Sequence, residues 1–263
     1  MSIVLSAIVP HPPLIIPFIG KENTERLKNT IQAYGKLEEY IYTSHIDTIV
    51  IISPHGFIQP NSFSINLNPK FIGDFEEFGD FTTKVKLNGN IGLAYKIRER
   101  LETRAPIQSI TTEKLDYGSS VPLYNLTKHL PGMRIIPIYY SGLDLESHYN
   151  FGKLLKRELV LSNNRVAVIA SGDLSHRLSK DAPSGYSPKA KKFDKKLIEY
   201  LSNSKIKDIL NMNHDLIHDA CECGLKSIVM LLGILNSINN KPEILSYEAP
   251  FGVGYLVMNF KLK

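Results

Sequence analysis

Three short runs of β-branched and aliphatic residues, each followed closely by a histidine, constrain the fold of this chain most strongly. The runs are 3–9, 48–52 and 166–170, and the histidines that follow them are His11, His55 and His176. Runs of this length, bounded by Pro and Gly, are typical of buried strands in a parallel α/β sheet. Because ligands of such sheets bind beyond the carboxyl ends of the strands, the three imidazoles are expected to meet there. Their number indicates a metal site.

The rest of the chain alternates between helical and extended patterns without a linker. Helices are expected where apolar residues recur at helical spacing, at 24–45, 91–101, 119–130, 145–161, 187–203, 205–212 and 216–235. Further strands are expected at 62–67, 81–87, 133–140, 244–248 and 254–261, and the first two of these have the alternation typical of antiparallel strands. This order predicts one α/β domain over residues 1–263 with a mixed sheet.

Composition and charge argue against two classes of partner. The net charge is +5, but the densest basic stretch, 189–196, has the helical spacing and nearby acids of a solvated helix face. We therefore expect no nucleic-acid partner. No window reaches the roughly 18 apolar residues of a membrane span, and the N-terminus lacks a signal-peptide pattern. No membrane partner and a cytoplasmic location are therefore expected, and the sparse, closely spaced cysteines fit a reducing compartment.

The turn at residues 219–224 offers a third ligand beside His11 and His55. It contains Glu222 and Cys223 and precedes an apolar helix. Either a carboxylate or a thiolate could complete a metal site with two histidines. The alternative is structural: the cysteines are small buried residues, and Glu222 is an acid favoured by the helix dipole. The residue types alone do not separate these interpretations.

Asp173 and His176 form a second pair, three residues apart after the third strand. Such a pair suits general acid–base catalysis, because the carboxylate can orient the ring and the imidazole can move a proton. Alternatively, Asp173 caps a following helix or turn. No Gly-x-Ser-x-Gly elbow and no glycine-rich nucleotide-binding motif occurs, which argues against a serine hydrolase and a nucleotide-binding protein.

Taken together, these motifs resemble those of the class III extradiol dioxygenase B-subunit (LigB-like) superfamily. Within it, the chain is most similar to the Memo-like branch, the AmmeMemoRadiSam system protein B type. The resemblance is carried by residues 9–14, 52–56, 115–118, 121–123, 171–178, 181–186, 223–224 and 250–255, which occur in a consistent order along nearly the whole chain. It implies a mixed central sheet with helices on both faces and a site at the strand ends.

The resemblance also implies roles for individual residues. His11 and His55 match the two histidine ligands of the metal. The third ligand of the family is a Glu in the dioxygenases and a Cys in Memo-like proteins; Cys223 matches this position, with Glu222 as the adjacent alternative. His176 matches the acid–base histidine of the dioxygenases, with Asp173 beside it.

Two departures from the dioxygenase pattern bear on activity. Tyr117 stands where the dioxygenases often carry a histidine that positions substrate and oxygen, and a phenol with a pKa near 10 is a poor base at neutral pH. Cys223 in place of Glu softens the ligand set toward Zn or Cu(I), while Fe(II) remains the metal that the resemblance implies.

These considerations give an ordered set of functional expectations. The first is a Memo-like mononuclear metal-binding protein, with non-haem iron oxidoreductase as its candidate activity. The alternative is a class III extradiol ring-cleaving dioxygenase acting on a catecholic substrate, and a metal-dependent hydrolase ranks third. The expected partners are a small molecule such as an aromatic diol, a radical SAM-associated protein and a second copy of the chain in a homodimer.

Overall fold

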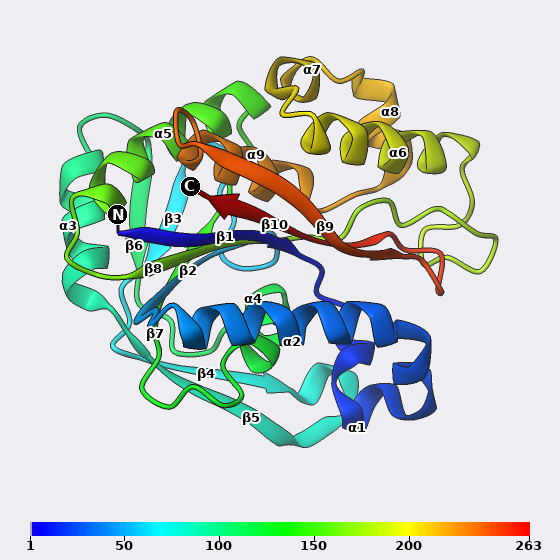
Figure 1. Ribbon diagram of the computed structural model, residues 1–263, viewed down its shortest axis with the longest axis horizontal. Coiled ribbons are helices and arrows are strands. Elements are labelled where there is room, and N and C mark those ends of the chain that lie inside the picture. The colour runs from blue at the N-terminus through cyan, green and yellow to red at the C-terminus, as the bar shows by residue number, and fades with distance from the viewer. Residues whose placement is uncertain (1) are drawn as a thin grey trace.

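A computed structural model describes residues 2–263, which form one ten-stranded mixed sheet with helices around it (Figure 1). The strands are β1 (Ile3–Val9), β2 (Thr48–Ser53), β3 (Phe63–Asn66), β4 (Lys70–Phe75), β5 (Asp80–Gly89), β6 (Ile107–Ile110), β7 (Arg134–Tyr139), β8 (Val166–Ser171), β9 (Asn240–Glu248) and β10 (Tyr255–Leu262). The helices are α1 (Pro17–Gly20), α2 (Lys28–Thr43), α3 (Ile91–Leu101), α4 (Tyr117–Leu126), α5 (Leu145–Val160), α6 (Pro188–Ser202), α7 (Ile206–Leu210), α8 (His214–Ala220) and α9 (Leu225–Ile234).

The centre of the sheet is parallel, as the three apolar runs predict. Its order is β4-β5-β7-β2-β8-β1-β10-β9, with β3 and β6 branching from β7. Strands β7, β2, β8 and β1 are mutually parallel, whereas β10 and β9 are antiparallel. Every residue of β2 and of β8 is buried, which is typical of parallel strands covered on both faces.

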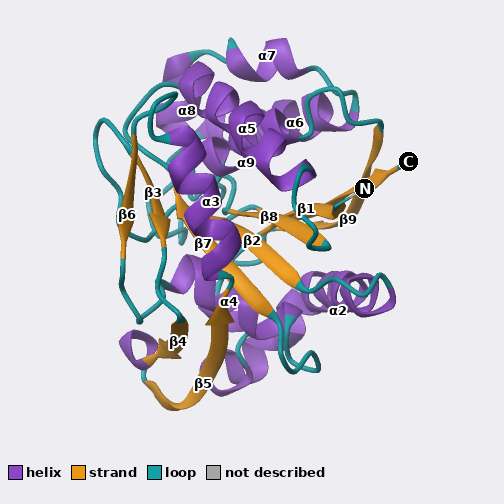
Figure 2. Ribbon diagram, turned by 90° about the vertical axis from the view of Figure 1, so that its left-hand side faces the viewer, coloured by secondary structure: helices purple, strands orange, loops and turns teal. Residues whose placement is uncertain are grey.

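Helices cover both faces of the sheet, because successive side chains of each strand point to opposite sides. In β2, Val50 and Ile52 pack into one core with α3, α5, α6 and α9, whereas Ile49 and Ile51 pack into a second core with α2 and α4. Figure 2 shows the two helical layers above and below the central strands. The expected fold class, a single α/β domain with a mixed sheet flanked on both sides, is confirmed.

The predicted helix over 216–235 is wrong as one element. The chain forms α8, turns, and starts again as α9. Cys221 ends α8 in the left-handed region (φ 51°), a conformation that a helix cannot continue through. The apolar pattern runs across this break, so periodicity alone does not reveal it. The turn that results carries Cys223.

Other elements differ in extent. The first part of the predicted helix over 24–45 is a 3₁₀ segment, Lys21–Leu27, that precedes α2, and α4 begins at Tyr117 and ends at Leu126. Strands β4 and β6 were not predicted; each lies beside a strand that was, β4 along β5 and β6 along β3. Among the described residues, no helix is long and apolar enough to span a membrane.

Candidate metal centre

The carboxyl ends of β1, β2 and β8 lie side by side and deliver two histidines to one point. β8 lies between β1 and β2, with Val9 opposite Ser171 and Ile52 opposite Ala170. His11 and His55 follow β1 and β2, and their Nε2 atoms are 3.1 Å apart. His11 is buried, whereas His55 is partly buried. The expectation that strand ends bring these imidazoles together therefore holds in the structure.

Cys223 reaches the same point from the turn between α8 and α9. Its Sγ lies 3.5 Å from His11 Nε2, and the ligand atoms of His11, His55 and Cys223 all lie within 4.8 Å of one another. Two backbone bonds fix the turn, since the amides of Cys223 and Gly224 both donate to the Asp173 carbonyl, at 3.4 and 3.0 Å. The end of β8 thus positions the sulfur against the histidines.

The hydrogen bonds around His11 determine which ring nitrogen is free. Ser171 Oγ donates to the Gly118 carbonyl at 2.5 Å and lies 2.9 Å from His11 Nδ1. Because the only hydroxyl proton of Ser171 is used, Nδ1 of His11 must be the donor in that contact. The lone pair of His11 is then on Nε2, which faces His55 and Cys223. A partner of this kind on the distal nitrogen is typical of metal-binding histidines.

The protonation states also suit a metal. Burial lowers the pKa of both His11 and His55 to about 3, so both rings are neutral at neutral pH, as metal ligands must be. Burial, together with the nearby Asp173, raises the pKa of the Cys223 thiol well above its ordinary value. A bound cation reverses this effect, because coordination deprotonates a thiol outright.

The spacing of the donor atoms fits a first-row divalent ion. With metal–nitrogen bonds of about 2.1 Å and a metal–sulfur bond of about 2.3 Å, ligand atoms of a tetrahedral site lie about 3.4 to 3.6 Å apart. The His11–His55 and His11–Cys223 separations of 3.1 and 3.5 Å are close to these values. These three residues could therefore hold a metal ion.

Glu222 lies outside this group of three ligand atoms. Its Oε2 accepts a hydrogen bond from the Leu225 amide at 2.5 Å, at the first turn of α9, where a carboxylate is favoured by the free amides and the helix dipole. Burial raises the pKa of Glu222 to about 7. Glu222 is thus bonded to the start of α9, whereas Cys223 lies beside the histidines.

Asp173 lies between the candidate ligands and His176. Its Oδ1 accepts from the His11 amide at 2.9 Å, and its Oδ2 is 3.8 Å from His11 Nε2 and 3.9 Å from His176 Nε2. Burial raises the pKa of Asp173 to about 6, although the nearby His176 and the His11 amide oppose this shift. After Asp173, no helix begins in the described chain until α6 at Pro188, so Asp173 is not a helix cap.

His176 does not join the group of three ligand atoms, contrary to the simple expectation that three strand-end histidines converge. Its Nε2 lies 3.9 Å from the Asp173 Oδ2, and its buried Nδ1 has no hydrogen-bond partner. The backbone amide of His176 donates to the Ala220 carbonyl at 3.0 Å, which ties the loop after β8 to the end of α8. The geometry suits a proton carrier beside the centre better than a ligand.

Tyr117 covers His55 at the start of α4. The two rings stack at 4.3 Å with an interplanar angle of 19°, and the Tyr117 hydroxyl lies 2.9 Å from His55 Nε2. Asp116 caps α4 by accepting from the Ser119 amide at 3.0 Å, and it also accepts from Ser53. Burial raises the pKa of Tyr117 above its ordinary value, so the phenol stays protonated and acts as a hydrogen-bond donor.

Three residues that the sequence analysis did not single out, Ser171, Gly118 and Asp194, contact the candidate ligands or the loop of His176. Ser171 orients His11, and Gly118 leaves room for His55, since a Cβ at Gly118 would lie 3.1 Å from His55 Cδ2. Asp194 on α6 accepts from the Ser175 amide at 2.9 Å and from Tyr247 at 2.7 Å, and so holds the loop of His176. Its sequence signal was a lone acid on the apolar face of a helix.

Comparison with known proteins identifies a family whose model matches most of the chain. Residues 5–258 match the family described as the catalytic LigB subunit of aromatic ring-opening dioxygenase. Protein CA_C1420 of Clostridium acetobutylicum is 33% identical over 264 residues, covering 97% of this chain and 56% of that protein. The chain therefore spans little more than half of that relative's length. The 3,4-dihydroxyphenylacetate 2,3-dioxygenase of Escherichia coli is 25% identical over 252 residues, covering 89% of this chain and 90% of the enzyme.

A solved structure supports the fold independently. The uncharacterized protein JW3007 from Escherichia coli K12 superimposes with a TM-score of 0.69 at 14% identity, covering 97% of this chain and 99% of that one. The family match spans nearly all of the sequence and includes the histidines, the loop after β8 and the turn before α9. The chain therefore belongs to the family of catalytic LigB subunits of aromatic ring-opening dioxygenases.

Proposed function

We propose that this protein is a Memo-like mononuclear metal-binding oxidoreductase in which His11, His55 and Cys223 hold a single metal ion. The observation that supports this most is the convergence of the three ligand atoms within 4.8 Å. Fe(II) is the first metal expected, because the chain belongs to a family of ring-opening dioxygenases. Cu and Zn are the alternatives, since a thiolate ligand favours softer ions.

The residues around the centre would tune the metal and move protons. When bound, an iron or copper ion supplies Lewis-acid and one-electron chemistry. The Asp173 amide donates to Cys223 Sγ at 3.3 Å, which stabilises charge on the sulfur. The Asp173 carboxylate, with a pKa raised to about 6 by burial, can orient His176. His176 then accepts or returns a substrate proton. Because the metal would use the one lone pair of His55 Nε2, the Tyr117 hydroxyl would be free to donate a hydrogen bond to a substrate.

A second function, extradiol cleavage of a catechol, is favoured by one relative. The similarity to 3,4-dihydroxyphenylacetate 2,3-dioxygenase extends over 89% of this chain. A cavity of about 400 Å³ is lined by Gly56, Phe57 and Asp116, but by none of the three candidate ligands. In that reaction the proposed proton carrier is His176.

Metal content separates the proposal from a purely structural role for the histidines. After anaerobic purification and loading with metal, we expect about one Fe, Cu or Zn ion per chain. Inductively coupled plasma mass spectrometry measures this metal content. His11→Ala and Cys223→Ala should lose the metal, whereas the matched control Glu222→Ala should keep it. Retention in Cys223→Ala with loss in Glu222→Ala would reverse the assignment of the third ligand. No metal in the wild type would refute the centre.

Oxygen consumption separates the two functions. The Fe(II)-loaded protein is mixed with 3,4-dihydroxyphenylacetate and with unsubstituted catechol, and oxygen uptake and the ring-fission product are followed. A product that disappears in His176→Ala while metal content is unchanged supports ring cleavage. Absence of product across catechols, with the metal bound, leaves the Memo-like metalloprotein as the function.

The proposed partners follow from the resemblance and the family. A small molecule with an aromatic ring is the proposed substrate, because the family is one of ring-opening dioxygenases. The likeness to the AmmeMemoRadiSam group adds a radical SAM-associated protein as a proposed macromolecular partner. Co-purification of the tagged chain with such a protein from its own cells tests this, with the His11→Ala variant as a comparison for dependence on the metal.

A further inference from the structure

Strand β5 has one paired edge and one largely open edge. Along one side it pairs with β4 from Asp80 to Asn88. On the other side it meets β7 only through Asn88 and Gly89, opposite Arg134 and Ile135. Beyond this short contact β5 is no longer paired with β7. Among the described residues, no strand pairs with residues 81–87 on that side. An open edge of this kind offers free amides and carbonyls to another strand.

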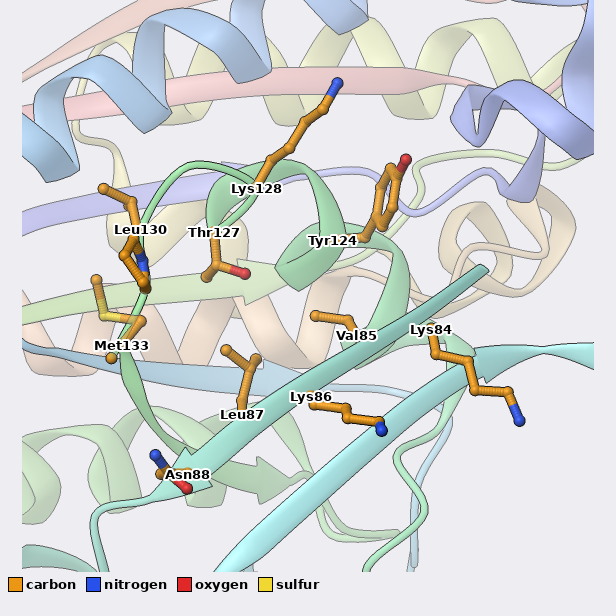
Figure 3. A pocket seen from close by; sticks show the side chains of 12 residues that line it. Lys84, Val85, Lys86, Leu87, Asn88, Tyr124, Thr127, Lys128, Leu130 and Met133 are labelled. Carbon is orange, nitrogen blue, oxygen red and sulfur yellow. The ribbon is translucent and has the colours of Figure 1, made fainter. Parts of the chain in front are cut away.

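A groove runs along this open edge. It has a volume of about 320 Å³ and lies between residues 84–88 of β5, the end of α4 and the loop 130–133 that leads into β7 (Figure 3). Its apolar lining includes Val85, Leu87, Leu130 and Met133. The groove therefore opens where an additional strand would continue the pairing between β5 and β7.

The two faces of β5 differ in chemistry along the groove. Val85 and Leu87 are half-buried on the side that carries Tyr124, whereas Lys84 and Lys86 are exposed on the other side (Figure 3). Lys128 adds a third ammonium group, and no carboxylate is among the residues that line the groove. Glu76 pairs with Lys84 at 3.5 Å, but the ion pairs of residues 2–263 do not include Lys86 or Lys128. The groove is thus positively charged.

We propose that this groove binds an extended, acidic segment of a partner protein, which adds a strand to the open edge of β5. Main-chain hydrogen bonds would supply affinity, and alternate side chains would supply selectivity. Because successive side chains of a strand point to opposite faces, the segment carries apolar residues at alternate positions, toward Val85 and Leu87. Glu or Asp at the intervening positions meets Lys84 and Lys86. The partner is identified by this alternation of acidic and apolar residues.

A labelled heptapeptide that alternates glutamate with valine tests the proposal by fluorescence anisotropy. We expect binding to the full chain to weaken about tenfold or more in the double variant Lys84→Glu/Lys86→Glu, since two ion pairs are lost and the reversed charges repel the glutamates of the peptide. The matched control is Lys191→Glu/Lys192→Glu, two exposed lysines of α6, and its affinity should be unchanged. A peptide with lysine in place of glutamate should bind the Lys84→Glu/Lys86→Glu variant better than the wild type.

Hydrogen exchange locates the contact. The bound heptapeptide should slow exchange of amides within residues 81–87, while those of α6 stay unchanged. The proposal is overturned if the heptapeptide does not bind, if its affinity is the same in both double variants, or if protection falls elsewhere. It is equally overturned if inorganic phosphate displaces the heptapeptide at concentrations where equal ionic strength from sodium chloride does not, because the groove would then be a small-anion site.

Discussion

Gly172, at the end of β8, and Gly224, at the start of α9, are in direct backbone contact. A Cβ atom on Gly172 would lie 2.1 Å from the Cα of Gly224, and one on Gly224 would lie 3.0 Å from the Asp173 carbonyl oxygen. No side chain fits between the two segments. This close approach brings Cys223 beside the strand ends that carry the histidines, so the position of the proposed third ligand depends on two glycines that are not themselves among the candidate ligands.

Gly172→Ala should therefore separate Cys223 from His11. We expect loss of most bound metal and destabilisation by about 1 to 3 kcal/mol, the usual cost of overpacking a tight contact. Metal content and urea unfolding measure the two effects. Gly35→Ala is the control, because a Cβ at Gly35, within α2, meets nothing within 4 Å; it should keep the metal and leave stability equal or higher. Full metal retention in Gly172→Ala would contradict this account of the turn.

Ser171→Ala should weaken metal binding without removing a ligand. The hydroxyl fixes the proton of His11 on Nδ1 by accepting from it, and loss of such a partner typically costs about 10- to 100-fold in affinity. Competition with a chromophoric chelator measures the change. Ser6→Ala is a matched control, since Ser6 is a buried serine of the neighbouring strand with no hydrogen-bond partner. Equal affinities in the two variants would show that the tautomer of His11 is fixed otherwise.

Tyr117→Phe should preserve the metal and reduce turnover. The ring can still stack on His55, but the hydroxyl that lies 2.9 Å from His55 Nε2 is removed. If a catechol is the substrate, we expect oxygen uptake to fall about 10- to 100-fold at unchanged metal content, the effect of losing one hydrogen bond to a charged group. Unchanged uptake would assign Tyr117 a packing role. Tyr117→His supplies the imidazole common in the dioxygenases and should raise ring fission above the level of Tyr117→Phe.

Asp194 gives the protein a pH dependence whose sign follows from its pKa. Burial raises that pKa from 3.8 to about 6, so the folded state favours the protonated form. Wild-type stability is therefore lost progressively as the pH rises from about 4 to 6 and stays reduced above. Asp194→Asn mimics the protonated form. The difference in unfolding free energy between Asp194→Asn and wild type should therefore shift by about 2 kcal/mol in favour of the variant between pH 4 and pH 6.

Urea unfolding at several pH values checks this prediction. Asp181→Asn is the control, because Asp181 is exposed, and its difference from wild type should not vary with pH in this way. Asp194 also accepts a hydrogen bond from the Ser175 amide, and the side-chain oxygen of asparagine can accept the same bond. The activity of Asp194→Asn at low pH should therefore stay close to that of wild type. A difference in stability that is flat between pH 4 and 7 would contradict the raised pKa.

The central strands were predictable from sequence because they are buried on both faces. Such strands are continuous apolar runs, and the runs over 3–9, 48–52 and 166–170 correspond to β1, β2 and β8. The outlying strands β4 and β6 are different: they are only partly buried, and their formation depends on distant partners. The break at Cys221 was predicted only in part: the polar turn at 219–224 was recognised, but the helix over 216–235 was still drawn through it.

The site was predictable as far as strand ends determine it. His11 and His55 meet because β1 and β2 flank β8 in parallel. The choice between Glu222 and Cys223 could not be made from the residues, because they are adjacent and the direction of each side chain is set by the cap of α9. Likewise, only the position of the Asp173 carboxylate shows that His176 lies apart from the three ligand atoms.

X-ray absorption spectroscopy of the iron-loaded protein tests the central claim most directly, because it counts the ligand atoms. We predict one sulfur neighbour at about 2.3 Å and a nitrogen shell, at roughly 2.0 to 2.1 Å, with the multiple scattering of two imidazoles. The sulfur contribution should vanish in Cys223→Ser. A wild-type spectrum that contains only nitrogen and oxygen neighbours, unchanged by that substitution, would contradict the proposed His11–His55–Cys223 centre.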